Sequence, residues 1–478
     1  KRLKKSLKTN LFEQFQNDSR VIDAKNILLD VYSEYQQKLT KKRPLHGSST
    51  TPNTSTDLDA NNCLSKEMIS LELRKGGGSI LPYLGSGMGS GSLVEMSDGR
   101  VVYDFISGIG AHFSHGDSKV VKANLDASFQ DVVNQGNLQQ NNGVVSLMEL
   151  LCETSGFDHC FLTTSGAMAA ENALKIMFQK KFPAHRILAF EGCFMGRTYL
   201  MSQITDKPGF REGIPTQVSV DYIPFYDENN AVESTRRAVD ALKTYLTRYP
   251  NQYAVMCMEL IQGEAGYYSG SREFFEVIMS ELKAHNVGIL VDEIQTFGRT
   301  GSFYAFQEFG LEKFVDVVTV GKLSQTCATL FNKDFSPKPG LLSQTFTSST
   351  SVIESSKVIL KEMRDGDYFG PDGKNMKIRE CFVRHLKRLS TMFPEKVEGP
   401  FGFGTMIAFT SFGGDKDKTI AFVKHLFNKG VLCFVAGRKV ARIRFLVPIG
   451  SVTEHDIDNV FLILEQELSV FEGLLIQK

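Results

Sequence analysis

The stretch VGILVDEIQTFGRTG, residues 287–301, decides the fold of this chain. Residues 287–291 are almost continuously apolar and are followed at once by the carboxylate of Asp292. A short, nearly continuous apolar run is typical of a strand that is buried on both faces of a parallel sheet. A carboxylate at the end of such a strand is costly unless it meets a cation. The stretch therefore predicts a buried strand that ends at a binding site.

Four further runs share this pattern, and helical stretches such as residues 274–284 alternate with them. The runs are residues 160–163, 187–190, 254–258 and 317–320. Strands that alternate with helices predict an α/β fold in which helices cover both faces of a sheet. We therefore expect an α/β large domain with a mostly parallel sheet covered by helices. After about residue 380 the pattern changes, which predicts a smaller α+β domain.

Chemically useful residues follow all five runs at once. They are Ser165 and Gly166, Phe194 and Arg197, Glu259, Asp292, and Lys322. Ligands of open α/β sheets bind in the crevice outside the carboxyl ends of the strands. The five ends therefore predict one shared site.

Three of these positions indicate a cofactor with a phosphate and a cationic ring. The turn at Gly166 begins a helix whose free N–H groups can hold a phosphate group. Asp292 can pair with the protonated nitrogen of a pyridine ring and so make the ring an electron sink. Lys322 follows a strand after one glycine, where a lowered pKa would let its amine form an imine. Taken singly, each position has a plainer interpretation: an ordinary strand–glycine–helix turn, a metal-ligating or helix-capping aspartate, and a solvated lysine.

Composition excludes several classes of function. The 478 residues contain 54 Lys plus Arg and 54 Asp plus Glu, so no overall field predicts nucleic acid or membrane as a partner. No apolar run reaches the length of a membrane-spanning helix. The eight cysteines form no CxxC pair and show no zinc-site spacing, so we predict no metal site. Scattered free thiols indicate a reducing compartment, and we expect a cytoplasmic protein.

The chain divides into four predicted parts. Residues 1–62 form a polar N-terminal extension and linker. Residues 44–62 are too polar to build a core. We interpret the basic start KRLKKSLKTN as a solvated, helix-prone segment, or alternatively as a targeting fragment or a nucleic-acid arm. Residues 63–117 form the N-terminal part of the small domain, with a hairpin at 93–105 that turns at Asp98-Gly99. Residues 118–380 form the large cofactor-binding domain. Residues 381–478 complete the small domain with strands at 404–412, 430–437 and 441–447 and a final helix from about Glu454.

Four motifs together resemble a known family. The segments CFMGRT (193–198), MELIQGEAG (258–266), ILVDEIQTFGRTG (289–301) and GKLSQ (321–325) are similar to those of the class III aminotransferases of the pyridoxal-phosphate fold-type I group. The resemblance covers residues 76–456, roughly four-fifths of the chain. It implies pyridoxal 5'-phosphate as the cofactor and a homodimer with the active site at the subunit interface.

The resemblance also implies roles for the cofactor-binding residues. Ser165, Gly166 and Ala167 match the phosphate-binding turn, and Phe194 matches the aromatic residue that stacks on the ring. Asp292 matches the partner of the pyridine nitrogen, and Gln295 matches the residue near the phenolic oxygen. Lys322 matches the Schiff-base lysine, which also moves the proton. Thr345 matches a threonine that reaches the phosphate of the neighbouring subunit.

Further residues match positions that bind the substrate. Arg197 matches an arginine that grips a carboxylate, and Glu264 and Arg444 match a gating pair. When the pair is closed, the site accepts an amine without a nearby carboxylate, and when it is open Arg444 binds the α-carboxylate of glutamate or 2-oxoglutarate. Ile109 lies where ornithine aminotransferase has a tyrosine that contacts substrate, which argues against ornithine as the main donor. Four features depart from the family pattern, so the resemblance does not identify the substrate: Met195, Met168, Ala170 and the segment TFTSSTS.

The resemblance implies a ping-pong aminotransferase that moves a terminal amino group to 2-oxoglutarate from a lysine-like, ornithine-like or 4-aminobutyrate-like donor. Within the family, GKLSQTC, GAMAAENALK and the GGS at 77–79 look most like lysine 6-aminotransferase. One alternative is another reaction on the same scaffold, such as an aminomutase or a racemase. A second is a catalytically silent binding or scaffold relative, although both Lys322 and Asp292 are present.

Overall fold

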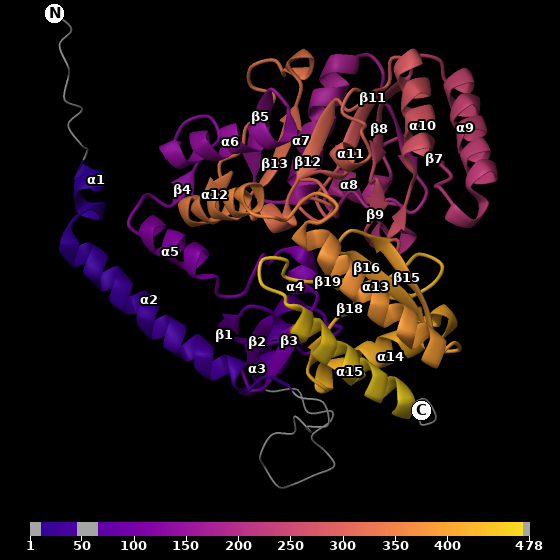
Figure 1. Cartoon of the computed structure of the whole chain (residues 1–478). Coiled ribbons are helices and arrows are strands. Elements are labelled where there is room, and N and C mark those ends of the chain that lie inside the picture. The colour runs from indigo at the N-terminus through magenta and orange to yellow at the C-terminus, as the bar shows by residue number, and fades with distance from the viewer. Residues whose placement is uncertain (1–10, 45–65, 472–478) are drawn as a thin grey trace, which may run out of the picture.

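The structure is a computed structural model that describes residues 11–44 and 66–471. The basic start of the chain and nearly all of the predicted connector 44–62 lie outside these residues. Figure 1 shows a large part built on a central sheet and a smaller part below it, with a long N-terminal helix along one side.

The central sheet has seven strands in the order β5, β13, β12, β11, β8, β6, β7. All neighbouring strands are parallel except β13, which is antiparallel to both of its neighbours. The bounds are β5 His159–Thr163, β6 Arg186–Phe190, β7 Val220–Ile223, β8 Tyr253–Met258, β11 Gly288–Asp292, β12 Val317–Val320 and β13 Cys327–Phe331. All five predicted runs are therefore strands of one mostly parallel sheet.

Two strands of this sheet did not stand out in the sequence. β7 alternates apolar and polar residues because it lies at the edge, where Asp221 accepts from Arg186 at 2.6 Å. β13 follows directly after Lys322 and the turn that contains it, with no room for a crossover helix. It runs antiparallel, so a sequence pattern of strand, helix and parallel strand could not predict it.

Helices cover the sheet on both sides (Figure 1). α10 (Arg272–Ala284) begins at Ser271, whose hydroxyl accepts from the Phe274 N–H, and buries the apolar face that its periodicity predicts. The other long helices of this part are α6 Asn142–Ser155, α7 Gly166–Lys181, α9 Ala231–Arg248 and α12 Thr350–Asp365. The short ones are α5 Ser118–Ala127, α8 Tyr199–Ile204 and α11 Ala305–Glu308, and the small strand pairs are β9 Ile261–Gln262 with β10 Tyr268–Ser269 and β4 Val133–Asn134 with β14 Ser348–Ser349.

The smaller part joins segments from both ends of the chain. One sheet contains β1 (Gly85–Ser90), β2 (Leu93–Met96), β3 (Val101–Asp104) and β17 (Val431–Leu432), and its β2–β3 hairpin is the predicted one. The second contains β15 (Val397–Phe403), β16 (Met406–Ser411), β19 (Arg442–Leu446) and β18 (Phe434–Ala436). The predicted strand 430–437 is thus two strands, which pair with different sheets. The helices are α3 Lys66–Lys75, α4 Ser107–Gly110, α13 Lys374–Met392, α14 Lys416–Asn428 and the predicted final helix, α15 Glu454–Val470.

The pairing of β17 with β3 supports the predicted sharing of the small domain between residues 63–117 and 381–478, and the domain boundaries themselves stay a prediction. The described part of the predicted N-terminal extension contains the helices α1 (Leu11–Gln16) and α2 (Ser19–Thr40). Gln36 of α2 donates to the carbonyl oxygens of Gly89 and Gly116 at 3.0 and 2.8 Å, which fixes this helix to the smaller part. Among the described residues, no helix is long and apolar enough to cross a membrane.

Candidate active site

The residues predicted to share one site do gather at the carboxyl ends of the central strands. Asp292 is the last residue of β11, Glu259 follows β8, and Lys322 follows β12 after Gly321. Asp292 and Lys322 lie close enough for each to shift the pKa of the other, and Glu259 acts on Lys322 in the same way. The strand ends therefore bring two carboxyl groups and one amine into the same buried space.

Asp292 is a buried carboxylate with an incomplete set of partners. Asp292 is only 7% exposed, and its Oδ1 accepts a hydrogen bond from the Ile294 N–H at 2.9 Å. Burial raises the pKa of Asp292 to about 6, although the Ile294 N–H and the nearby Lys322 act in the opposite direction. A cation placed against the carboxylate would stabilise its charged form, as the prediction of a pyridinium partner requires.

Lys322 is an amine that protein surrounds on most sides while part of its surface stays accessible. Burial lowers its pKa, and the positive charge of Arg444 lowers it further. Its backbone lies in the left-handed region with φ of 50°, as does that of Gln325 with φ of 62°. Such conformations cost of order 1 kcal/mol or more for residues other than glycine and persist where the surrounding structure enforces them. Here the Gln325 side chain donates to the carbonyl oxygen of Ala111, which ties the lysine turn to the segment after α4.

The turn at residues 165–167 can hold a phosphate group. Ser165 is the N-cap of α7, and its hydroxyl accepts from the Met168 N–H at 3.2 Å. A Cβ atom at Gly166 would lie 2.9 Å from the Ile294 side chain, so only glycine lets this turn approach the segment after Asp292. The remaining free N–H groups at the start of a 16-residue helix favour an anion.

Phe194 and Gln295 lie beside the groups at the strand ends. The Phe194 N–H donates to Glu259 Oε2 at 2.8 Å, which fixes the aromatic residue beside the strand end. Gln295 packs against Gly263, where a Cβ atom would lie 2.6 Å from the Gln295 side chain. Gln295 Oε1 is buried without a hydrogen-bond partner among the described residues, and a buried oxygen of this kind can serve a bound ligand.

These observations fit pyridoxal phosphate. Its phosphate would meet the free donors of the helix start, and its ring nitrogen would meet the buried carboxylate that needs a cation. Its aldehyde would meet the amine with a lowered pKa, and its phenol would meet the buried oxygen that has no partner among the described residues.

The predicted gating pair is formed in this structure. Arg444 Nη2 lies 3.1 Å from Glu264 Oε2, and the side chains are 2% and 24% exposed. Lys207 Nζ contacts the other carboxylate oxygen of Glu264 at 2.9 Å. Burial raises the pKa of Glu264, but Arg444 and Lys207 outweigh this effect and the pKa is lowered overall. The carboxylate is therefore held ionised between two cations.

Arg197, Ile109 and Thr345 are the remaining predicted site residues. Arg197 is exposed, with its guanidinium 3.8 Å from the centre of the Phe210 ring. Ile109 has φ of 63° and lies within a run of four left-handed residues, 107–110. Thr345 is exposed in the segment before β14. The strand-end residues and the gating pair thus come together, whereas Thr345 faces outward from its own chain.

Sequence reasoning assigned no role to two residues that the structure makes prominent. Glu259 accepts from the N–H groups of Phe194 and Gly263, and burial together with Asp292 raises its pKa to about 8. Arg299 is 1% exposed and donates to the carbonyl oxygens of Gly110 and Val447 at 3.0 and 3.1 Å. Its position in the deciding stretch could have marked Arg299, but its partners come from distant segments and are visible only in the fold.

Three potential metal ligands, Cys381, His385 and Asp458, lie within 4.8 Å of one another on α13 and α15. The sequence did not predict this group because the two helices are far apart in the chain. Arg384 Nη2 donates to Cys381 Sγ at 3.4 Å and lies 3.8 Å from Asp458, so the group already has a counter-cation. It gives no argument for a metal.

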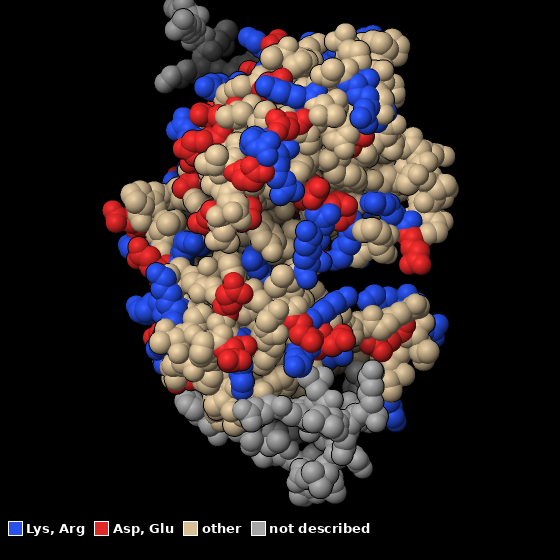
Figure 2. Space-filling view, turned by 90° about the vertical axis from the view of Figure 1, so that its right-hand side faces the viewer, with Lys and Arg blue, Asp and Glu red and all other residues tan. Residues whose placement is uncertain are grey.

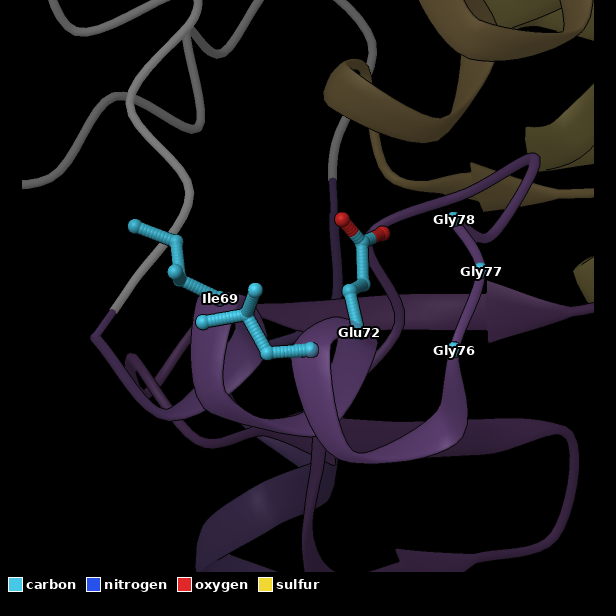
Figure 3. Close-up of a pocket in the computed structure, with 6 residues that line it drawn as sticks. Ile69, Glu72, Gly76, Gly77 and Gly78 are labelled. Atoms are coloured by element: carbon cyan, nitrogen blue, oxygen red, sulfur yellow. The ribbon is translucent and has the colours of Figure 1, made fainter.

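Figures 2 and 3 show two hollowed features of the molecule. Figure 2 shows a notch between the upper and lower parts of the molecule, with basic side chains along both of its edges. The hollow in Figure 3 is a separate feature, lined by Ile69, Glu72, Leu73 and residues 76–78. In it Glu72 accepts from the Ser79 N–H at 3.0 Å, which closes the glycine turn after α3. None of the predicted site residues lines this hollow.

Comparisons with known proteins agree with this geometry. The family model of the class III aminotransferases matches residues 86–468. An acetylornithine aminotransferase from Archaeoglobus fulgidus is 29% identical over 79% of this chain and 93% of its own length, and one from Methanocaldococcus jannaschii is 27% identical over 77% and 89%.

Solved structures share the fold. A lysine aminotransferase from M. tuberculosis superposes with a TM-score of 0.71 at 20% identity, covering 87% of this chain and 96% of its own. An ornithine aminotransferase from Toxoplasma gondii gives 0.73 at 20% identity, covering 86% and 96%. The matched residues include the strand-end residues and the Glu264–Arg444 ion pair, and the chain belongs to the class III aminotransferase family.

Proposed function

We propose that the protein transfers a terminal amino group from an amino acid to 2-oxoglutarate by a ping-pong mechanism, with pyridoxal phosphate as the cofactor. The observation that carries this proposal is the partly buried Glu264–Arg444 pair near Lys322. Arg444 is 1% exposed and close enough to Lys322 to lower its pKa. Glu264 neutralises this arginine close to the reacting amine. Such a pair suits an enzyme that must leave the arginine unavailable while the donor binds and must then use it to bind the α-carboxylate of the acceptor.

The residues at the strand ends would hold the cofactor. We assign its phosphate to Ser165, Gly166 and Ala167, its ring face to Phe194, and its ring nitrogen to Asp292. When bound, the cofactor supplies an electron sink that stabilises negative charge on the carbon that bears the migrating amino group. Asp292 keeps the ring nitrogen protonated, because an ionised carboxylate in a buried place favours a cation as its neighbour.

Lys322 would act as the covalent anchor and as the base. Its lowered pKa leaves more of the amine neutral at physiological pH, which is the form that attacks a carbonyl and accepts a proton. The enforced backbone of the turn keeps the Cα atom of Lys322 at one place relative to Asp292. Gln295, whose buried Oε1 has no partner among the described residues, is assigned to the phenolic oxygen of the cofactor.

The gating pair would adapt one pocket to two substrates. While Glu264 holds Arg444, no free cation meets the near end of the donor, so a terminal amine can approach. When the pair opens, Arg444 is free to bind the α-carboxylate of 2-oxoglutarate through its two-pronged guanidinium. Arg197, exposed above Phe210, is the candidate for a second substrate carboxylate.

The donor is proposed to be lysine-like, ornithine-like or 4-aminobutyrate-like, with lysine first. Ile109 offers an apolar side chain at the place where a tyrosine hydroxyl could otherwise bind a polar donor, which supports lysine over ornithine. The acetylornithine aminotransferases among the relatives keep acetylornithine as a donor to be tested.

A homodimer with shared active sites is part of the proposal. Exposed apolar residues surround the β4–β14 pair, with Val132, Val133, Leu138 and Phe346 being 60%, 52%, 82% and 47% exposed. Apolar side chains concentrated on one exposed feature indicate a protein interface. Thr345 is next to this surface, so a second copy docked there would receive its hydroxyl near the phosphate site. The seven described cysteines are free, which supports the further proposal of a reducing, cytoplasmic location.

The test is an absorption spectrum of the purified protein with pyridoxal phosphate, recorded before and after L-lysine, L-ornithine, N-acetylornithine or 4-aminobutyrate is added. We expect one donor to convert the bound-cofactor band and 2-oxoglutarate to restore it. Lys322→Ala should lack the starting band, and Lys313→Ala, remote from the site, should keep it. Turnover without any requirement for 2-oxoglutarate would instead support an aminomutase, and a protein that binds no cofactor would overturn the proposal.

A further inference from the structure

Glu264 is held by two cations at once, and the second was not expected from the sequence. Its Oε2 lies 3.1 Å from Arg444 Nη2 and its Oε1 lies 2.9 Å from Lys207 Nζ. The exposure of the three side chains rises outward, from 2% for Arg444 through 24% for Glu264 to 42% for Lys207. The carboxylate therefore lies between a buried arginine and a lysine nearer to the solvent.

Lys207 is held in this position by its surroundings. Its Nζ lies 4.5 Å from the centre of the Phe210 ring, which is within the range of a cation–π contact. The Arg197 guanidinium also lies over the Phe210 ring. The Phe210 ring packs edge-on against the Phe194 ring, with centroids 6.3 Å apart. Pro208 follows directly and begins a short helical turn, Pro208–Phe210, which fixes the backbone beyond the lysine.

We propose that Lys207 is a positioning residue of the gate: it keeps Glu264 neutralised when Arg444 leaves, and so makes Arg444 available to the carboxylate of the second substrate. This inference rests on the proposed function. Its physical basis is the cost of an unpaired, mostly covered carboxylate, since breaking a buried ion pair strands a charge and is strongly unfavourable. With Lys207 in place, release of Arg444 leaves Glu264 with a partner and a path toward water.

The inference predicts an asymmetry between the two halves of the cycle. The donor half-reaction uses the closed pair and does not need Glu264 to change partners. The acceptor half-reaction needs Arg444 free, so the loss of Lys207 should slow it alone. A merely structural role for Lys207 would affect both halves alike, because both use the same cofactor and the same Lys322.

The experiment measures both half-reactions separately in the cofactor-loaded enzyme by stopped-flow absorption, for wild type and Lys207→Met. We expect the second-order rate constant with 2-oxoglutarate to fall about 10-fold to 30-fold, and that with the donor to change less than about 2-fold. Lys207→Arg should restore the acceptor rate. Lys313→Met is the matched control, because Lys313 also lies over an aromatic ring, 4.7 Å from the centre of Phe314, and it should leave both rates unchanged.

A double-mutant cycle separates the gate from direct substrate contact. If Lys207 acts by neutralising Glu264, Lys207→Met should cost nothing further in a Glu264→Gln background, where no carboxylate needs a partner. If Lys207 binds the substrate itself, the loss should persist in that background, and the inference is overturned. Equal slowing of both half-reactions, or an unchanged acceptor rate in Lys207→Met, would overturn it as well. Failure of wild type itself to react with 2-oxoglutarate would overturn the proposed function, and this inference with it.

Discussion

Replacing Asp292 by asparagine should stabilise the cofactor-free protein while it disables cofactor binding. The substitution keeps an oxygen that can accept from the Ile294 N–H and removes only the charge. Burial raises the pKa of Asp292 from 3.8 to about 6, so the ionised form costs the folded state roughly 3 kcal/mol once the pH is well above both values. Asparagine carries no such cost.

The pH dependence gives the prediction its sign. The pKa of Asp292 is higher in the folded than in the unfolded chain, so stability is present at low pH and is lost as the pH rises through the folded value. The advantage of Asp292→Asn should therefore grow by about 2 kcal/mol between about pH 4.5 and about pH 8. For a chain of 478 residues the unfolding entropy is about 1 kcal/mol per kelvin, which makes the change in Tm about 2 °C.

The assay is thermal unfolding of cofactor-free wild type and variant across this pH range, repeated with saturating pyridoxal phosphate. With the cofactor the order should reverse, because only wild type offers a carboxylate to the ring nitrogen. Asp316→Asn is the matched control: Asp316 is equally buried and accepts from the Ile289 N–H, but Lys283 already pairs with it at 2.7 Å, so its loss should destabilise at every pH. A Tm difference for Asp292→Asn that is independent of pH, or that has the opposite sign, would refute the reasoning.

The remaining predictions concern the gate, strand β15 of the smaller part and the dimer. Arg444→Gln should slow the half-reaction with 2-oxoglutarate by about 100-fold and the donor half-reaction by less than about 10-fold, as measured by stopped-flow absorption, since a charge-assisted carboxylate contact contributes about 1.5–3 kcal/mol. Gly402→Ala should lower Tm by several degrees, because the new Cβ would lie 2.0 Å from a backbone carbonyl oxygen, whereas Gly413→Ala, also at positive φ but in open space, should lower it far less. Thr345→Ala should weaken cofactor binding about 10-fold, and mixing it with Lys322→Ala should give hybrid dimers in which one site has both Lys322 and Thr345 and binds the cofactor as tightly as wild type; a mixture in which no tight-binding active site appears at limiting cofactor would argue against shared sites.

Much of the fold and of the site could be predicted from the sequence, because parallel strands leave a local signature. A strand buried on both faces must be apolar along its length, and its polar successor must lie at the carboxyl edge of the sheet. This rule placed residues as distant in the chain as Ser165, Asp292 and Lys322 in one site. It did not reveal β13, because an antiparallel strand that follows a tight turn needs no helix, nor did it show that residues 430–437 pair with two different sheets.

Only the tertiary structure decided which groups touch across the chain. The sequence determined that residue 292 carries a carboxylate, that residue 322 carries an amine and that both end apolar strands. The raised pKa of Asp292, the strained turn at Lys322, the unpartnered oxygen of Gln295 and the second cation on Glu264 depend on neighbours from distant segments. Local sequence fixes residue type and periodicity, whereas burial and charge pairing arise when separate elements pack together and exclude water.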